Sequence, residues 1–115
     1  MIHSANVYFV ADDALPAFIK NTRTEGSLCG QLSRQLRPAL VATDLLQNAT
    51  RQNLLLTIDY FISPQDYQRC LRSPSYETLL RFRQNMSVVA IQLGAFSFPP
   101  HPEVTEPAAT ERAVL

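Results

Sequence analysis

Among its 115 residues the sequence has no tryptophan, only three glycines, two cysteines and two histidines. Two cysteines, Cys29 and Cys70, do not make a disulfide framework, so we expect buried free thiols in a cytoplasmic protein. Three scattered glycines exclude a Gly-rich phosphate-binding loop. His3 and His101 lack an evident Ser or Cys partner for nucleophilic catalysis, and no spacing of His, Cys and carboxylates matches a metal site. We therefore expect neither a metal nor another cofactor.

Excess charge of one sign and long apolar runs are also missing. Ten basic residues balance ten acidic ones, which argues against a nucleic-acid partner. No window approaches the roughly 20 apolar residues of a membrane span, and we expect no signal peptide at Met1. Nine of the ten basic residues are Arg. Arg69, Arg72, Arg81 and Arg83 fall on the second helical region, where a solvated helix face is the ordinary interpretation and an anion site is the alternative.

The most informative stretch is a predicted strand from Leu54 to Ile62. Period-two alternation divides it into two faces. One set is wholly apolar and is expected to pack against helices: Leu54, Leu56, Ile58, Tyr60 and Ile62. The other set is mixed and is expected to face away from the helices: Leu55, Thr57, Asp59 and Phe61. Asp59 stands out because a carboxylate on such a face needs a partner or a wet cavity.

A capped helix follows this strand directly. Ser63 is a predicted N-cap, and Pro64 fits the first helical position, where its missing N–H costs nothing. Asp66 is favoured near the positive end of the helix dipole. Ser73-Pro74 repeats the start signal, so we expect the helix to kink or restart there.

The other segments complete an α+β pattern. In chain order they are a strand over 6–11, a helical region over 15–36 with a break near Gly26, a strand over 39–47, the strand and helix just described, and a strand over 87–98 in which Gly94 suggests a bulge. Asp12 and Asp13 are expected to cap the first helix. The order β-α-β-β-α-β predicts a ferredoxin-like domain over residues 1–98, with an antiparallel four-stranded sheet and two helices on one face. Residues 99–115 are Pro-rich and predicted to be irregular.

At this point the chain resembles a known family. Leu54–Leu80, with Ser63-Pro64-Gln65-Asp66-Tyr67 and Ser73-Pro74-Ser75-Tyr76, is similar to the antibiotic biosynthesis monooxygenases, which are dimeric α/β barrels. Asp59 takes the position of that family's acidic strand residue, and Phe61 that of a frequent Trp. Tyr67 and Tyr76 take the two aromatic helix positions.

The resemblance implies a homodimer with a cavity between sheet and helices, which binds a small apolar or aromatic molecule. Some members of the family oxidise aromatic polyketides with oxygen and no cofactor, and others degrade haem. The haem-degrading branch uses a strand Asn, for which Asn6 is available. Its Trp and His positions hold Cys70 and Leu80 here, which argues against that chemistry.

A cofactor-free oxygenation needs a base that deprotonates a phenol-like substrate inside a dry cavity. Asp59 is the candidate catalytic base. The candidate substrate-binding residues are Asn6, Tyr8, Thr57, Phe61, Tyr67 and Gln92. The alternative for Asp59 is a buried carboxylate paired with an arginine at a dimer interface. For the tyrosines and Phe61 the alternative is core or interface packing, and the protein is then a non-catalytic dimer that binds a ligand or another protein. An isomerase or cyclase is a third possibility, because this fold hosts many functions.

Overall fold

The computed structural model describes residues 1–24 and 26–100. These residues form four strands and four helices, in the order β1 (Ile2–Phe9), α1 (Leu15–Arg23), α2 (Leu28–Gln35), β2 (Leu40–Gln47), β3 (Leu54–Phe61), α3 (Pro64–Leu71), α4 (Pro74–Asn85) and β4 (Val89–Phe96). Each of the two predicted helical regions is therefore a pair of short helices. Pro99 and Pro100 lie in no helix or strand, and the rest of the predicted tail is outside the described residues.

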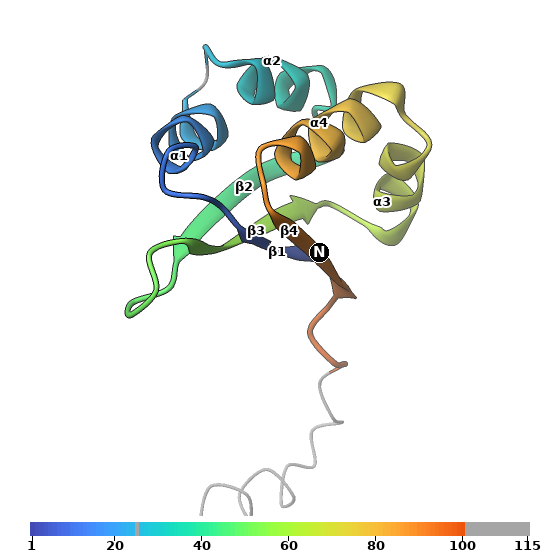
Figure 1. Ribbon diagram of the computed structural model, residues 1–115. Helices are drawn as coiled ribbons and strands as arrows, with labels where there is room; N and C mark the ends of the chain where they lie inside the picture. The colour runs from blue at the N-terminus through green and yellow to red at the C-terminus, as the bar shows by residue number, and fades with distance from the viewer. Residues whose placement is uncertain (25, 101–115) are drawn as a thin grey trace, which may run out of the picture.

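The strands form one antiparallel sheet in the order β2-β3-β1-β4. All four helices lie on the same side of this sheet, and no element within residues 1–24 and 26–100 covers its other side (Figure 1). The predicted ferredoxin-like arrangement is confirmed. The edge strands of the sheet are β2 and β4. The first strand, β1, lies beside the last strand, β4, so the two ends of the fold meet in the sheet.

The local signals near the strand ends are mostly confirmed. Gly94 has a φ of 102°, and the β1–β4 register shifts beside it, between Ala5 and Asn6. A left-handed conformation of this kind favours glycine, which is why the bulge falls there. The predicted cap of α1 is wrong, because Ala14 occupies the N-cap without a side-chain bond. Asp12 instead accepts a hydrogen bond from the Asn53 side chain at 2.7 Å.

The turn from β3 into α3 is fixed by a reciprocal pair of hydrogen bonds. Ser63 Oγ accepts from the Asp66 backbone N–H at 3.1 Å and donates to Asp66 Oδ2 at 2.9 Å. Pro64 occupies the first helical turn. The first bond satisfies a backbone donor that the helix itself leaves unpaired, so the helix begins at a defined residue.

Replacing Ser63 with alanine should therefore lower the free energy of unfolding by about 1 kcal/mol. Equilibrium urea denaturation measures this change. Ser73→Ala is the matched control, because Ser73 precedes α4 at the same position and forms no side-chain capping bond. An equal loss of stability in the two variants would contradict the capping role of Ser63.

The predicted assignment of the two faces of β3 is wrong. Leu55, Thr57, Asp59 and Phe61 are all buried beneath the helices, with exposed fractions of 1% or less. The more apolar set, which includes Leu54, Leu56, Ile58 and Tyr60, lies on the uncovered side and is only half-buried. The sheet thus turns its mixed face inward, and it turns its apolar face toward the side where no helix or strand of the described residues packs.

The core beneath the helices has two parts. One cluster lies around α2, α4 and the end of β3, and its buried members are Cys29, Leu32, Leu36, Ala39, Leu40, Phe61, Cys70, Tyr76 and Leu79. The other lies around α1 and contains Tyr8, Val10, Leu15, Phe18 and Leu55. Asp59 and Thr57 belong to neither cluster although both are fully buried. A polar layer therefore separates the two apolar clusters.

Candidate functional site

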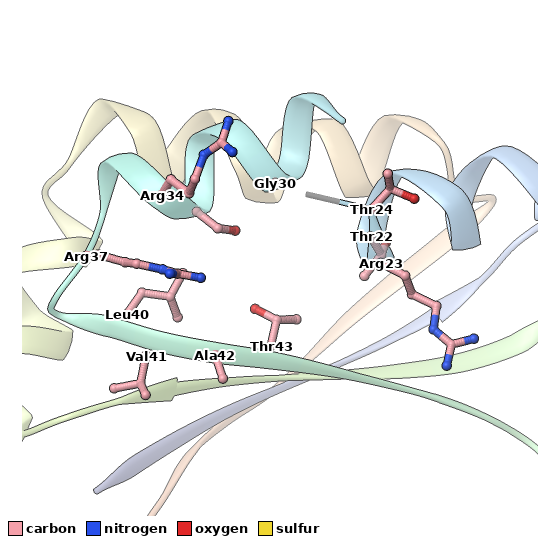
Figure 2. A pocket seen from close by; sticks show the side chains of 11 residues that line it. Thr22, Arg23, Thr24, Gly30, Arg34, Arg37, Leu40, Val41, Ala42 and Thr43 are labelled. Atoms are coloured by element: carbon pink, nitrogen blue, oxygen red, sulfur yellow. The ribbon is translucent and has the colours of Figure 1, made fainter. Parts of the chain in front are cut away.

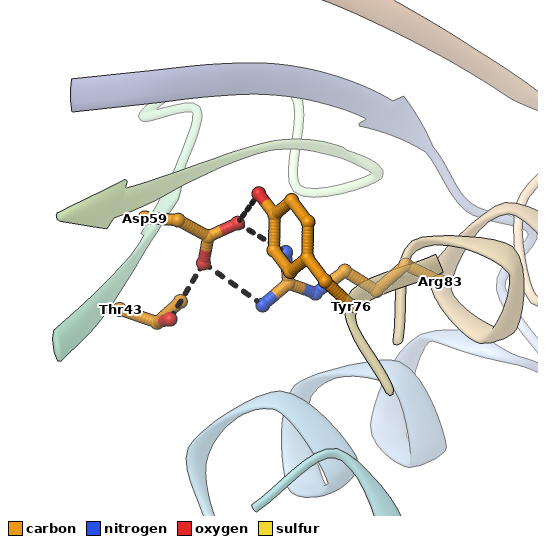
Figure 3. Close-up of polar contacts among 4 residues, drawn as sticks. All are labelled: Thr43, Asp59, Tyr76 and Arg83. Carbon is orange, nitrogen blue, oxygen red and sulfur yellow. Dashed lines mark hydrogen bonds and ion pairs between the residues drawn. The ribbon is translucent and has the colours of Figure 1, made fainter. Parts of the chain in front are cut away.

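Asp59 is the centre of this polar layer (Figure 3). Its carboxylate is 0% exposed and accepts four hydrogen bonds. Arg83, from α4, donates from both terminal nitrogens, at 2.9 Å to Oδ2 and 3.2 Å to Oδ1. Tyr76 OH donates to Oδ2 at 2.8 Å, and Thr43 Oγ1 donates to Oδ1 at 2.6 Å. The four donors come from α4 and β2, so the network ties the helical layer to the sheet.

The charge of this group follows from these contacts. Burial disfavours the ionised form of Asp59, but the Arg83 charge and the hydrogen bonds from Arg83, Thr43 and Tyr76 outweigh it and lower the pKa of the carboxyl. Burial lowers the pKa of Arg83, but the charge of Asp59 outweighs this effect, and the pKa of Arg83 is raised overall. Both groups are ionised at neutral pH. The sequence-based alternative, a carboxylate paired with an arginine, matches this geometry, although it lies under the helices.

Tyr76 connects this ion pair to a cavity. Its ring packs edge-on against Phe61, with centroids 5.4 Å apart. Burial and the neighbouring Asp59 charge both raise the pKa of the Tyr76 phenol, so it stays protonated. Because the phenol proton is donated to Asp59, the oxygen retains lone pairs that can accept a hydrogen bond from a bound molecule.

The cavity has a volume of about 200 Å³ and lies between the β1–β4 side of the sheet and helices α3 and α4. Its lining is mostly apolar with several polar groups, and consists of Ser4, Asn6, Tyr67, Leu71, Tyr76, Leu80, Gln92 and Gly94. Asn6 and Gln92 are direct partners in the β1–β4 register, so their amide groups leave the sheet side by side. We call this cavity the sheet–helix pocket.

Three predicted substrate-binding residues, Asn6, Tyr67 and Gln92, line this pocket together. Asn6 also pairs with Thr57 across β1 and β3, so these two side chains leave the sheet on the same face. Tyr8 and Thr57 are not among the residues that line the pocket, and both are buried, at 2% and 0% exposure.

Phe61 and Asp59 lie behind the pocket wall. Phe61 packs against the rings of Tyr67 and Tyr76 and belongs to the core. Asp59 does not line the pocket, and the residue that links it to the pocket is Tyr76, which lines the pocket and donates a hydrogen bond to the carboxylate. Any role of Asp59 in substrate chemistry must therefore act through Tyr76.

Arg83 is the functional residue that the sequence interpretation missed. It is 2% exposed, which contradicts the predicted solvated helix face, whereas Arg69, Arg72 and Arg81 are exposed as expected. Helical spacing was the available signal, because Arg83 follows Leu79 by four residues and Tyr76 by seven, and both of those are buried. An arginine in register with an apolar stripe indicates a buried charge that needs a partner.

Other kinds of site receive no support from the described residues. Within residues 1–24 and 26–100, no three His, Cys, Asp or Glu side chains come together in a way that could hold a metal ion. None of the helices described combines the length and the apolar character needed to cross a bilayer. Both cysteines are buried and free, and burial raises the pKa of each thiol.

Comparisons with known proteins give different results for the sequence and for the structure. No protein-family model matches the sequence, and no curated protein sequence matches it significantly. Solved structures do match. SnoaB, a cofactor-independent oxygenase from Streptomyces nogalater, superposes with a TM-score of 0.62 and 13% identity over 89% of this chain and 96% of that one.

An antibiotic biosynthesis monooxygenase gives a TM-score of 0.60 with 13% identity, over 87% of this chain and all of that one. The fold is that of the antibiotic biosynthesis monooxygenases. A conserved protein from Methanosarcina mazei Go1 shares it with a TM-score of 0.64 and 11% identity, over 85% of this chain and 92% of that one. The monooxygenase fold therefore also carries proteins that are named for no activity.

Proposed function

We propose that this protein is a cofactor-independent monooxygenase that acts on a small aromatic substrate in the sheet–helix pocket. The observation that carries the proposal is the position of Tyr76, whose side chain lines the pocket and whose hydroxyl donates to a buried, ionised Asp59 at 2.8 Å. The likeness to SnoaB in fold supports the same chemistry. The free, buried cysteines agree with a cytoplasmic protein.

The lining of the pocket selects the class of substrate. Leu71 and Leu80 provide apolar surface, and the Tyr67 ring provides a flat one. The amides of Asn6 and Gln92 each offer a donor and an acceptor, which suits a hydroxyl or carbonyl group on an aromatic ring. A volume of about 200 Å³ favours a substrate of a few rings at most.

The chemistry begins with removal of a proton from a phenolic or enolic substrate. The substrate hydroxyl donates to the Tyr76 oxygen while the Tyr76 proton moves to Asp59. The new Tyr76 O–H then faces the substrate anion, and Arg83, no longer neutralised by Asp59, attracts that anion. The cost rises by about 1.4 kcal/mol for each pKa unit between substrate and Asp59, so the proton shift is transient.

The anion then reacts with molecular oxygen. It gives one electron to O₂, and the resulting substrate radical and superoxide combine to form a carbon–oxygen bond. Asp59 returns its proton through Tyr76 to the peroxide, and loss of water from this hydroperoxide, which also removes the hydrogen of the same carbon, leaves one oxygen atom in the product as a carbonyl. The protein contributes an anion-stabilising, largely water-free site.

Tyr76→Phe tests this role directly, because it keeps the ring and its packing and removes only the hydroxyl. We expect oxygen uptake with a panel of one- to three-ring phenols and enolisable aromatic ketones in the wild type. In the variant, kcat should fall by about 100-fold or more, which is the range of general acid–base catalysis.

Tyr60→Phe is the matched control, because Tyr60 OH donates to Asp44 at 2.6 Å in an equivalent pair on the opposite side of the sheet. It should leave kcat within about twofold of the wild type. Equal rates in the wild type and Tyr76→Phe would refute the relay. The absence of uptake with every compound in the panel would refute the oxygenase.

A specific observation favours a second candidate function, a non-catalytic ligand-binding protein. All the strong acceptor positions of Asp59 are already occupied, and a carboxylate so well satisfied resists taking a proton. Ligand-induced stabilisation by the same compounds, with no oxygen uptake and with binding weakened in Asn6→Ala and Gln92→Ala, would select this function over the oxygenase.

We also infer that a second copy of the chain covers the open side of the sheet. That side carries large apolar side chains at 42–53% exposure: Phe9, Leu46, Val89, Ile91, Leu93 and Phe96. Such a continuous apolar surface is unusual for a monomer and typical of an obligate homodimer interface. The sheet–helix pocket lies on the other side of the sheet, so each copy would hold its own site.

A further inference from the structure

A second cavity lies between helices α1 and α2 and the beginning of β2, and it shares no residue with the sheet–helix pocket. Its volume is about 140 Å³ (Figure 2). Its lining is Thr22, Arg23, Thr24, Gly30, Ser33, Arg34, Arg37, Leu40, Val41, Ala42 and Thr43. Three arginines and four hydroxyl side chains thus surround one small space, which contains no acidic side chain among its lining residues.

The three arginines are placed differently around this space. Arg37 extends between α2 and β2, with its guanidinium inside the cavity, and the Thr43 hydroxyl points into the same space (Figure 2). Arg23 and Arg34 lie at the rim, with their guanidinium groups turned outward (Figure 2). Long arginine side chains can rotate at small cost, so the rim groups can close over an occupant of the cavity.

The charge of this cavity has no counterpart within the described part of the chain. No ion pair joins Arg23, Arg34 or Arg37 to an acidic side chain there. Asp44, on β2, is engaged with Tyr60 instead. Arg23 and Arg34 occupy the last turns of α1 and α2, where a cation stabilises the helix dipole. Arg37 follows the end of α2, so the dipole does not account for its position.

We propose that this cavity binds a small oxyanion, a carboxylate or a phosphate, with Arg37 as the principal ligand. A guanidinium presents paired donors that match two oxygens of either group. The hydroxyl protons of Thr22 and Thr43 are already donated to Phe18 O and to Asp59, so the remaining bonds come from the hydroxyls of Thr24 and Ser33. Arg23 and Arg34 raise the local positive potential and attract the anion. The partly enclosed shape limits the occupant to a small molecule or to a single acidic group at the end of a larger one.

The test is a titration of the full chain with inorganic phosphate and, separately, with malonate at constant ionic strength, followed by amide chemical shifts. Saturable shifts should concentrate at Gly30, Ser33 and Thr43. Arg37→Ala should raise the dissociation constant at least tenfold, because the paired, charge-assisted hydrogen bonds are lost. Arg37→Lys should raise it less, since the charge remains and the paired geometry does not.

Arg51→Ala is the control, because it removes the same charge from the turn between β2 and β3, away from this cavity. It should bind both anions like the wild type. Saturation by phosphate alone or by malonate alone identifies the ligand class. Equal effects of Arg37→Ala and Arg51→Ala, or shifts that spread over all surface arginines without saturating, would overturn the proposal and indicate general charge attraction only.

Discussion

Replacing Arg83 with methionine is expected to lower the free energy of unfolding by about 3–5 kcal/mol. The substitution keeps much of the side-chain volume but leaves the Asp59 charge buried at 0% exposure without its counterion. The total free energy of unfolding of a domain of this size is only about 5–15 kcal/mol. The melting temperature should fall by roughly 15 °C or more. Thermal and urea denaturation followed by circular dichroism measure both quantities.

The double variant Asp59→Leu with Arg83→Met separates the role of the pair from that of each charge. Removing both charges removes the penalty of a lone buried ion, and it should recover most of the loss. Two hydroxyls, on Tyr76 and Thr43, lose their acceptor. Both line cavities, so each can turn toward solvent at small cost. A double variant as unstable as Arg83→Met would show that the network stabilises the fold by more than charge neutralisation.

The dependence of stability on acidic pH tests the Asp59–Arg83 ion pair independently. The pKa of Asp59 is lowered in the folded protein, so its contribution to stability is complete above the unfolded value of about 3.9 and is lost as the pH falls through the folded value. Arg83 stays charged throughout. Between pH 5 and 2, the wild type should therefore lose more stability than the double variant. Parallel pH profiles would contradict a lowered pKa at Asp59.

The two faces of β3 show what sequence periodicity can and cannot predict. Alternation correctly separates Leu54, Leu56 and Ile58 from Thr57 and Asp59, because successive side chains leave a strand on opposite sides. It does not say which side faces the helices. Hydrophobicity alone favours the wrong side here. The polar side faces inward because Arg83 and Tyr76, 17 to 24 residues away in sequence, supply the partners that make burial of Asp59 tolerable.

Signals contained within a few residues are the ones that predict structure here. Ser63-Pro64, Ser73-Pro74 and Gly94 each act on their own backbone, and the structure confirms a helix start at the first two and the bulge at the third. The sheet–helix pocket could be predicted from the sequence only in part. Asn6 and Gln92 could be placed on one face from strand parity, but their adjacency depends on the β1–β4 register, which the sequence does not reveal. The partners of Asp59 are long-range and were not predictable from local pattern.

The second prediction with a large expected effect concerns the open side of the sheet. Ile91 is 51% exposed, lies on the edge strand β4 and pairs in register with Val7 on the uncovered face. If a second copy covers this face, Ile91→Asp places a charge in an apolar interface, and twice over because the interface is symmetric. Such a charge costs several kcal/mol, so the dimer dissociation constant should rise more than 100-fold.

Size-exclusion chromatography with light scattering measures this directly, with the wild type expected at twice the mass of the chain and Ile91→Asp at the mass of one chain. Leu28→Asp is the matched control, because Leu28 is 44% exposed on α2, on the helical side. It should remain a dimer. A monomeric wild type at every concentration would contradict the homodimer, and so would an Ile91→Asp variant that keeps its full mass. Since the sheet–helix pocket lies under the helices, monomeric Ile91→Asp should still bind the pocket's ligands, and this separates assembly from the site.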